Sequence, residues 1–295
     1  KISDYSPDLI GISTMSIEYA EASHMLTSQL KKVMPEIQII MGGSYPTLLP
    51  ELAMKDGNVD YLVLQEGEFR FPKLLESIEN NERDIDKLEG IAYRKNKKPI
   101  INKPTGYPED LDKIPFPAYD LVDFRDYSSR NNKYSLYNNP RYLPYGVTIT
   151  SRGCPYFCNF CSTVNIHGRK IRYRSPENVL AEIDWMVEEY GIKELIFLDD
   201  NLLLNRKRIV TILNGLIERN YDLHWKAINV ATFALDDELL GLMKKSGCYQ
   251  VSLPIESGNP RVLRKIIRKP LNLQKATKVV DMAKKWGMEI ICCFV

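Results

Sequence analysis

Short apolar runs alternate with amphipathic segments along the first third of the chain. The apolar runs lie at 8–13, 37–43 and 61–65. Apolar residues recur at helical spacing in the segments that follow, at 18–34, 48–55 and 69–79. Strands that are apolar throughout and alternate with helices are typical of a parallel sheet covered on both faces. The pattern therefore predicts an α/β unit.

A hairpin and a proline-rich stretch follow. The sequence GIAYRKNKKPIIN predicts two strands that turn at Asn96-Lys97. Between Lys103 and Pro144 the chain has six prolines and a tyrosine-rich polar middle, a composition typical of a linker.

From Tyr145 onward, strands and helices alternate again. The predicted strands lie at 146–151, 194–199, 224–229, 249–254 and 288–294. The predicted helices lie at 176–190, 206–219 and 236–245, with helical segments within 261–286. Five βα-type repeats without an intervening antiparallel pair predict a β/α barrel or part of one. In such barrels the active site lies at the carboxyl ends of the strands.

We therefore expect an α/β protein with three parts. Residues 1–85 form a Rossmann-like domain that lacks its first strand and helix, 86–144 form the hairpin and linker, and 145–295 form a partial β/α barrel. The chain starts at Lys1 rather than Met and stops inside an apolar run, so we expect a fragment of a longer protein.

Composition and charge narrow the classes of function. The chain has 295 residues, 44% of them hydrophobic and 26% charged, which is ordinary for a globular protein. Its formal net charge is +2 and its basic residues are scattered, so we expect no nucleic-acid partner. No apolar run approaches the roughly 20 residues of a membrane span, and the chain does not open with a signal peptide. We therefore expect a cytoplasmic protein that does not bind membranes.

Three of the six cysteines lie within eight residues, in the sequence GCPYFCNFCS. They are Cys154, Cys158 and Cys161, and Gly153 and Pro155 favour a loop over a helix here. Structural zinc sites and most iron-sulfur clusters have four protein ligands. A site with three thiols leaves one coordination position open, and an open position is typical of a catalytic metal site.

Two other interpretations of the cysteines remain. His167, six residues beyond the last of them, could complete a structural zinc site of three cysteines and one histidine. Three buried thiols without a metal are the other interpretation, and the polar neighbours Arg152 and Asn159 argue against it.

Polar residues also follow the other predicted barrel strands. Asp199-Asp200 follow the second strand, Asn229 ends the third and Glu256 follows the fourth. The cysteine loop follows the first, so all of these groups would lie on one rim. A carboxylate at a strand end can also cap the next helix.

The C-x3-C-x2-C spacing, with Phe160 before the last cysteine and a barrel strand before the loop, resembles the radical S-adenosylmethionine (radical SAM) superfamily. The resemblance implies that Cys154, Cys158 and Cys161 hold three irons of a four-iron, four-sulfur cluster, and that SAM chelates the fourth. One electron from the cluster then cleaves SAM to a 5′-deoxyadenosyl radical, which abstracts hydrogen from a substrate. No catalytic residue is identified beyond the cluster.

The same resemblance assigns residues to SAM. It implies that Asp199 and Asp200 contact the amino group of SAM, Glu256 the ribose hydroxyls and Phe160 the adenine. Asn229 would stand at the third-strand contact to the SAM carboxylate, although many relatives have an arginine nearby. Many relatives also have an aromatic residue two positions after the acidic pair, where this chain has leucine.

The order of Rossmann-like domain, hairpin, linker and cysteine loop resembles the cobalamin-binding branch of that superfamily. Ser13-Thr14, followed by Gly42-Gly43, is similar to its cobalamin-binding pattern, and Gly67 stands in a similar glycine-acid turn. Small residues at strand ends let the backbone approach a nucleotide, although glycines also serve plain turns. The histidine motif that supplies a lower cobalt ligand in some cobalamin proteins is absent from this sequence.

The resemblance implies a cobalamin-dependent radical SAM enzyme that transfers a methyl group to an unactivated carbon. Radical oxidation or ring formation, as in anaerobic porphyrin-ester cyclases, is the alternative within this chemistry. A zinc-stabilised binding module without catalysis is the alternative from another class. The implied partners are a small-molecule or peptide substrate and an electron donor such as flavodoxin or ferredoxin.

Overall fold

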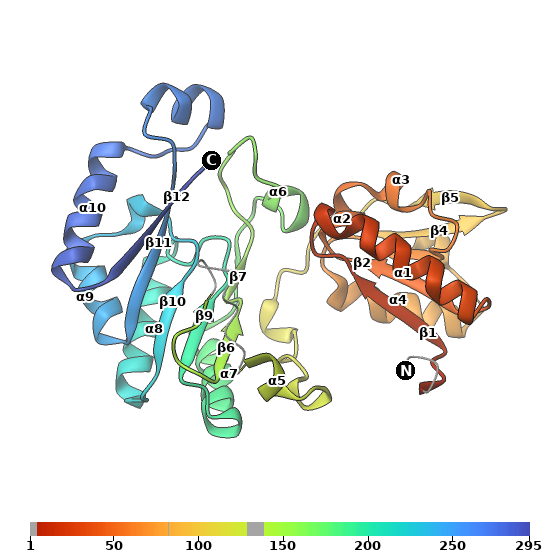
Figure 1. Cartoon of the computed structure of the whole chain (residues 1–295), viewed down its shortest axis with the longest axis horizontal. Helices are drawn as coiled ribbons and strands as arrows, with labels where there is room; N and C mark the ends of the chain where they lie inside the picture. The colour runs from red at the N-terminus through yellow and green to blue at the C-terminus, as the bar shows by residue number, and fades with distance from the viewer. Residues whose placement is uncertain (1–4, 82, 129–138) are drawn as a thin grey trace. The chain divides into compact units, whose positions relative to one another are not determined.

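The computed structural model describes residues 5–81, 83–128 and 139–295, which form two compact units (Figure 1). Unit 1 comprises residues 1–108 and 162–168, and unit 2 comprises residues 109–161 and 169–295. The predicted hairpin continues the sheet of unit 1. The part of the predicted linker at 129–138 lies outside the described residues.

Unit 1 contains one five-stranded sheet in the order β1-β2-β3-β4-β5. The strands are β1 (Leu9–Ser13), β2 (Gln38–Gly42), β3 (Tyr61–Val63), β4 (Ile91–Lys95) and β5 (Lys98–Ile101). The first three are parallel to one another, and β4 and β5 are antiparallel to their neighbours. Asn96 and Lys97 both have positive φ, as the tight turn of a hairpin requires. The predicted turn is confirmed.

Helices cover both faces of this sheet. They are α1 (Ala20–Val33), α2 (Ser44–Leu48), α3 (Pro50–Ala53) and α4 (Gly67–Glu79). Along β2, Ile39 packs with α1 and Met41 with α2 and α3, whereas Ile40 packs with α4 on the opposite face. The predicted Rossmann-like arrangement is confirmed.

Unit 2 contains a parallel sheet in the order β12-β11-β10-β9-β6. Its strands are β6 (Tyr145–Thr148), β9 (Glu194–Phe197), β10 (His224–Ala227), β11 (Cys248–Glu256) and β12 (Glu289–Phe294). Its long helices are α7 (Pro176–Tyr190), α8 (Arg206–Arg219), α9 (Asp237–Lys245) and α10 (Leu273–Lys285). These helices lie along one side of the sheet (Figure 1), and this is the predicted partial β/α barrel.

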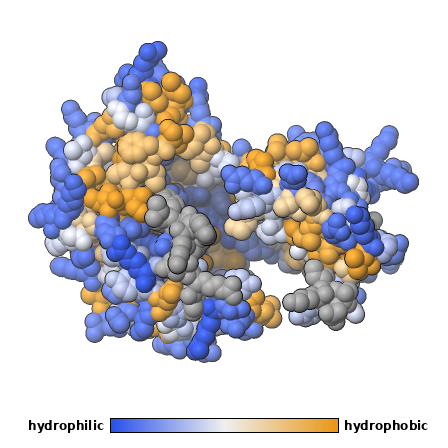
Figure 2. Space-filling view, viewed as in Figure 1, coloured by the Kyte–Doolittle hydropathy of each residue, from blue (hydrophilic) through white to orange (hydrophobic). Residues whose placement is uncertain are grey.

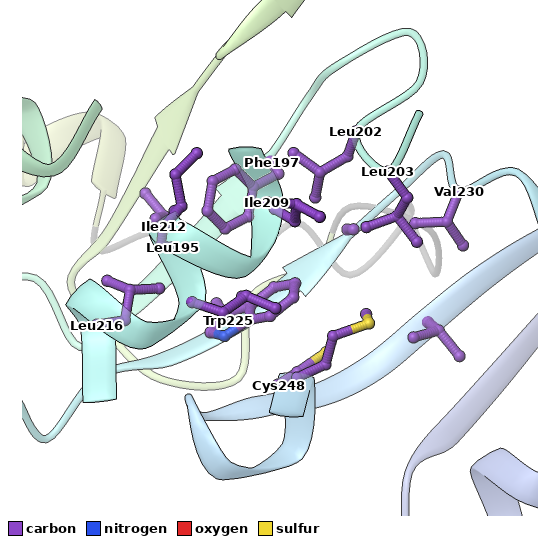
Figure 3. Close-up of a cluster of buried hydrophobic side chains, with 14 of the residues drawn as sticks. Leu195, Phe197, Leu202, Leu203, Ile209, Ile212, Leu216, Trp225, Val230 and Cys248 are labelled. Atoms are coloured by element: carbon purple, nitrogen blue, oxygen red, sulfur yellow. The ribbon is translucent and has the colours of Figure 1, made fainter. Parts of the chain in front are cut away.

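The core of unit 2 lies between this sheet and its helices (Figure 3). Phe197 and Trp225 meet edge to face, with ring centroids 5.2 Å apart. Ile209 and Ile212 of α8 belong to the same cluster. Leu202, which stands where many radical SAM relatives have an aromatic residue, is buried in this cluster (1% exposed).

A capping side chain starts each long helix of unit 2. Ser175, Asn205, Asp236 and Asn272 each accept a hydrogen bond from the backbone N–H three residues later. These caps fix the point at which each loop from a strand end enters its helix.

The sequence did not reveal several short elements. They are β7 (Ser151–Arg152), β8 (Arg172–Tyr173), α5 (Phe124–Ser128) and α6 (Thr163–Ile166). The π-helix η7 (Val262–Ile267) lies within the helical segments predicted at 261–286. There are also single-turn 3-10 helices at Ile17–Tyr19, Ile85–Lys87, Leu111–Lys113, Tyr119–Leu121 and Thr232–Ala234. In the described ranges, no helix is long and apolar enough to cross a membrane. The face shown in Figure 2 mixes hydrophilic residues with smaller apolar areas.

Candidate functional site

The three clustered cysteines lie on an irregular loop that follows β7. Cys154 and Cys158 are half-buried, and Cys161 is exposed. Gly153 precedes them with φ +98°, a conformation that L side chains rarely adopt. The N–H of Cys161 donates to the carbonyl of Cys158 at 3.2 Å, which draws the last two cysteines into a turn. The loop predicted from Gly153 and Pro155 is confirmed.

Hydrogen bonds hold the cysteine loop at its start and in its middle. The N–H of Gly153 donates to Asp200 Oδ2 at 3.1 Å. Asn159 donates through its backbone N–H to the carbonyl of Ile267 (3.0 Å) and through Nδ2 to the carbonyl of Ile266 (2.7 Å). The loop is therefore tied to the chain after β9 and to η7.

An arginine steadies the aromatic part of the loop. Arg169 donates to the carbonyl of Tyr156 at 3.0 Å, and its guanidinium lies 3.7 Å from the ring centroid of Phe157. The ring of Phe160, assigned to the adenine of SAM, is 52% exposed. It is accessible to a planar group from solution.

The thiols influence one another's ionisation. Burial raises the pKa values of Cys154 and Cys158 above the ordinary thiol value, and Cys161 adds to the rise in both. A carboxylate contributes to each rise, Asp200 for Cys154 and Glu256 for Cys158. Without a metal, Cys154 and Cys158 therefore keep their protons, and metal binding would release them.

The arrangement disfavours a single zinc ion. In the part of the chain that the structure describes, no three His, Cys, Asp or Glu side chains are grouped as a metal ion requires. His167, the fourth ligand of the zinc alternative, lies in unit 1, with Nδ1 3.1 Å from Glu66 Oε1. A four-iron cluster gives each thiolate its own iron, so it does not require the sulfurs to converge on one point. Three soft thiols on one wrapping loop suit such a cluster.

Asp199 and Asp200 occupy different environments. Asp199 is buried, and it accepts hydrogen bonds from Thr150 N (3.1 Å), Thr150 Oγ1 (2.8 Å) and Ser151 Oγ (2.5 Å). Burial raises the pKa of Asp199, against the effect of these hydrogen bonds and the charge of Arg208. Asp200 is half-buried and reaches the cysteine loop.

Asn201 is a site residue that the sequence did not single out. It is buried, and a hydrogen bond from its side chain lowers the pKa of Cys154. Its Oδ1 atom is buried without a hydrogen-bond partner among the described residues. Its position directly after Asp199-Asp200 is the sequence feature that could have identified Asn201 as a site residue.

Asn229 and Glu256 lie at the predicted strand ends. Asn229 is half-buried, two residues beyond β10. Glu256 ends β11 with φ +66° and is 7% exposed. Its Oε1 lies 2.8 Å from Nζ of Lys269. The sequence did not single out Lys269, because its segment shows only a helical pattern.

The predicted cobalamin-binding residues of unit 1 lie at the carboxyl edge of its parallel strands. Ser13 ends β1 and Gly42 ends β2, and the N–H of Thr14 donates to the carbonyl of Gly42 at 2.8 Å. Gly43 has φ +97°, and a Cβ there would lie 2.6 Å from the carbonyl oxygen of Thr14. Gly42 and Gly67 have no neighbour closer than 3.7 Å to an added Cβ. Of these three glycines, only Gly43 is at a position where a larger side chain would clash.

A network of polar side chains lies beside the carboxyl edge of the unit 1 sheet. Nδ1 of His24 lies 2.8 Å from Asp56 Oδ2, and Nε2 lies 2.8 Å from the hydroxyl of Tyr45. Thr27 donates to Asp56 at 2.6 Å. The N–H of Tyr45 donates to the carbonyl of Thr14 at 3.1 Å. The network therefore joins α1 and α2 to the turn that contains Thr14.

Residues 162–168, which directly follow the cysteine loop in the chain, contribute to the same unit. Besides the His167–Glu66 contact, Gln65 Nε2 donates to the hydroxyl of Tyr107 (2.8 Å) and to the carbonyl of Asn165 (3.4 Å). Oε1 of Gln65 is buried and has no hydrogen-bond partner among the described residues. It is an acceptor two residues beyond β3.

Two family models match successive parts of the chain. The model of the Radical SAM superfamily matches residues 148–295, and the model of the B12 binding domain matches residues 1–75.

Curated relatives match along the chain. An uncharacterized methyltransferase of Pyrococcus horikoshii is 32% identical over the whole chain, and cytidylyl-2-hydroxyethylphosphonate methyltransferase of Streptomyces wedmorensis is 33% identical over 99% of it. The chain spans 61% and 58% of the lengths of these two relatives. Anaerobic magnesium-protoporphyrin IX monomethyl ester cyclase of Synechocystis is 28% identical over 82% of the chain and 46% of its own length.

A solved structure shares the fold. The cobalamin-dependent S-adenosylmethionine radical enzyme OxsB, with aqua-cobalamin bound, superposes with a TM-score of 0.81 over 99% of this chain and 41% of that chain. The two sequences are 18% identical.

Proposed function

Because this chain belongs to the radical SAM superfamily, we propose that it forms a 5′-deoxyadenosyl radical from SAM and, with cobalamin, transfers a methyl group to an unactivated carbon. One observation carries the proposal: three cysteines share one loop, and the strand-end acid Asp200 accepts a hydrogen bond from the N–H of Gly153 at the start of that loop. The B12 binding match over residues 1–75 supports the cobalamin part.

The residues of unit 2 would divide the work at the barrel rim. Cys154, Cys158 and Cys161 would hold a four-iron, four-sulfur cluster, which when bound supplies the single electron that cleaves SAM. Asp200 would orient the SAM amino group, and its contact with the cysteine loop supports this role. Asp199 would not contact SAM itself but would hold the chain after β6 in position, because Thr150 and Ser151 donate hydrogen bonds to its carboxylate oxygens.

The resemblance to the family assigns the remaining contacts to SAM. The carboxylate of Glu256 would accept hydrogen bonds from ribose hydroxyls, and Phe160 would stack on the adenine. Asn229 would face the SAM carboxylate from the end of β10. Asn201 brings a buried amide oxygen without a partner among the described residues, which suits an ammonium or hydroxyl donor.

The carboxyl edge of the unit 1 sheet suits a nucleotide-like group. Gly43 leaves the Thr14 backbone without a side chain against it. Beyond β3, Gln65 Oε1 is a buried acceptor that has no partner in the part of the chain that the structure describes. Ser13, Gly42 and Gly67 would line the same edge. Cobalamin would supply a methyl-carrying cobalt there.

Methyl transfer is preferred over ring formation because the relatives that are 32% and 33% identical to this chain are named as methyltransferases. The cyclase match keeps oxidative ring formation as a second candidate. The acceptor would be a small molecule or peptide, and a flavodoxin or ferredoxin would supply electrons. A cytoplasmic location and the absence of a nucleic-acid partner stay predictions.

A substrate-independent experiment separates these functions. The full-length protein is loaded anaerobically with iron, sulfide and cobalamin, reduced, and given SAM with a labelled methyl group. A methyltransferase is expected to form labelled methylcobalamin with S-adenosylhomocysteine, and 5′-deoxyadenosine in addition. Formation of 5′-deoxyadenosine without a methyl group on cobalt favours the cyclase. Absence of both products from a fully loaded protein contradicts the proposal.

A further inference from the structure

Lys269 is a largely buried cation beside the cysteine loop. Its side chain is 16% exposed, and its Nζ lies 2.8 Å from Oε1 of Glu256, whose side chain is 8% exposed. Burying two charges is costly unless they pair closely. The close pair with Glu256 therefore keeps the Lys269 ammonium group in this position.

The backbone delivers Lys269 to this position through the π-helix η7. Its N–H donates to the carbonyl of Leu263 at 2.9 Å, and Arg268 before it has φ +60°, which turns the chain at the end of η7. The last two carbonyls of η7 accept from Asn159, the residue that follows Cys158. The segment that carries the lysine is thus bonded directly to the cysteine loop.

We propose that Lys269 is a positioning residue that holds the Glu256 carboxylate and, through its fixed positive charge beside the cysteine loop, sets the reduction potential of the cluster. The inference rests on the proposed function, because it requires a cluster on the three cysteines. One-electron reduction adds a negative charge to the cluster. A nearby cation stabilises the reduced form and raises the potential, and a nearby carboxylate lowers it.

Removal of the Lys269 charge and removal of the Glu256 charge are expected to shift the reduction potential of the cluster in opposite directions. Removing the lysine charge leaves Glu256 uncompensated, so the potential falls. Removing the carboxylate charge leaves Lys269 uncompensated, so the potential rises. A purely structural contact would not produce this reversal of sign.

The test is a redox titration of the full-length, reconstituted protein, followed by the electron paramagnetic resonance (EPR) signal of the reduced cluster. Lys269→Met is expected to shift the midpoint potential to more negative values, and Glu256→Gln to more positive values. Lys269→Arg keeps the charge and is expected to retain the wild-type potential. Lys265→Met, which removes an exposed lysine from η7, is the matched control and is also expected to match wild type.

Two results would overturn the inference: midpoint potentials of Lys269→Met and Glu256→Gln equal to wild type, or shifts of both in the same direction. If Lys269→Met does not assemble a cluster, the sign of the Glu256→Gln shift decides. Failure of the proposed function is visible earlier, because the wild-type protein would then take up no iron-sulfur cluster, and the inference would fall with it.

Discussion

Asp199 and Asp200 are neighbours in sequence, yet their contacts give them different work. Asp199→Asn would place an amide N–H₂ in the position of Oδ2, against the N–H of Thr150, and would remove the charge that strengthens the hydroxyl bonds to Oδ1, so we expect a loss of about 1–3 kcal/mol in the free energy of unfolding. Asp200→Asn keeps an acceptor for the N–H of Gly153 and removes only the charge. We expect its unfolding free energy to change by less than about 0.5 kcal/mol.

Urea unfolding and SAM binding together check this pair. Loss of a charge-assisted hydrogen bond predicts that Asp200→Asn binds SAM about tenfold or more weakly in the cluster-loaded protein. Equal stability losses in the two variants would refute the division of roles between them.

Gly43 supports a second prediction at the residue scale. Gly43→Ala places a Cβ 2.6 Å from the carbonyl oxygen of Thr14, at a φ of +97°. We expect a loss of about 1–3 kcal/mol in unfolding free energy and weaker cobalamin binding. Gly57→Ala is the matched control, since a Cβ there meets no atom within 4 Å and its φ is ordinary. Thermal unfolding and a cobalamin titration measure both effects, and indistinguishable variants would contradict the steric account.

Elements are joined by contacts that local sequence cannot reveal, and Asp56 is the clearest case. It follows α3 and accepts hydrogen bonds from Thr27 of α1 (2.6 Å) and from the N–H of Asn58 (2.9 Å), with His24 of α1 2.8 Å away. Burial by itself would raise the pKa of Asp56, but these hydrogen bonds together hold it below the ordinary value of 3.8. The ionised carboxylate therefore stabilises the folded state.

The sign of that pKa shift predicts a pH dependence. A carboxyl whose pKa is lower in the folded than in the unfolded state contributes stability above the unfolded value, and this is lost as pH falls through the folded value. We expect Asp56→Asn to lose about 1–3 kcal/mol at pH 7 and to approach wild type below pH 3.8. Asp86→Asn, an exposed control, should show no such trend in urea unfolding. A difference for Asp56→Asn that is independent of pH would count against the network.

The elements themselves could be predicted where their start and stop signals are local. The predicted ranges of α7 and α8 agree with the structure, because Ser175-Pro176 and Asn205 begin the helices and left-handed Gly191 and Asn220 end them. Strands of two residues, such as β7 and β8, are too short to show a period. Lys269 and Asn201 were missed because their importance depends on which loop the folded chain brings beside them.

At the scale of the whole molecule, the two cofactors are assigned to different units. The cysteines lie in unit 2 and the Thr14–Gly43 turn in unit 1. Cys158→Ala is therefore expected to lose the cluster's iron while it retains cobalamin at the wild-type ratio. Iron analysis and the cobalamin absorbance of the full-length variant check this, with Cys248→Ala, a buried cysteine remote in sequence from the loop, as the control that keeps both. Loss of both cofactors from Cys158→Ala alone would show that the units are not independent.

The central claim is that three thiols hold a cluster with one iron open to SAM. The most direct measurement is the iron and sulfide content of the anaerobically reconstituted full-length protein, combined with its EPR spectrum before and after addition of SAM. We expect about four irons and four sulfides per chain and a spectrum that changes when SAM binds the open iron. A colourless protein with one zinc per chain, or a cluster whose spectrum does not respond to SAM, would contradict it.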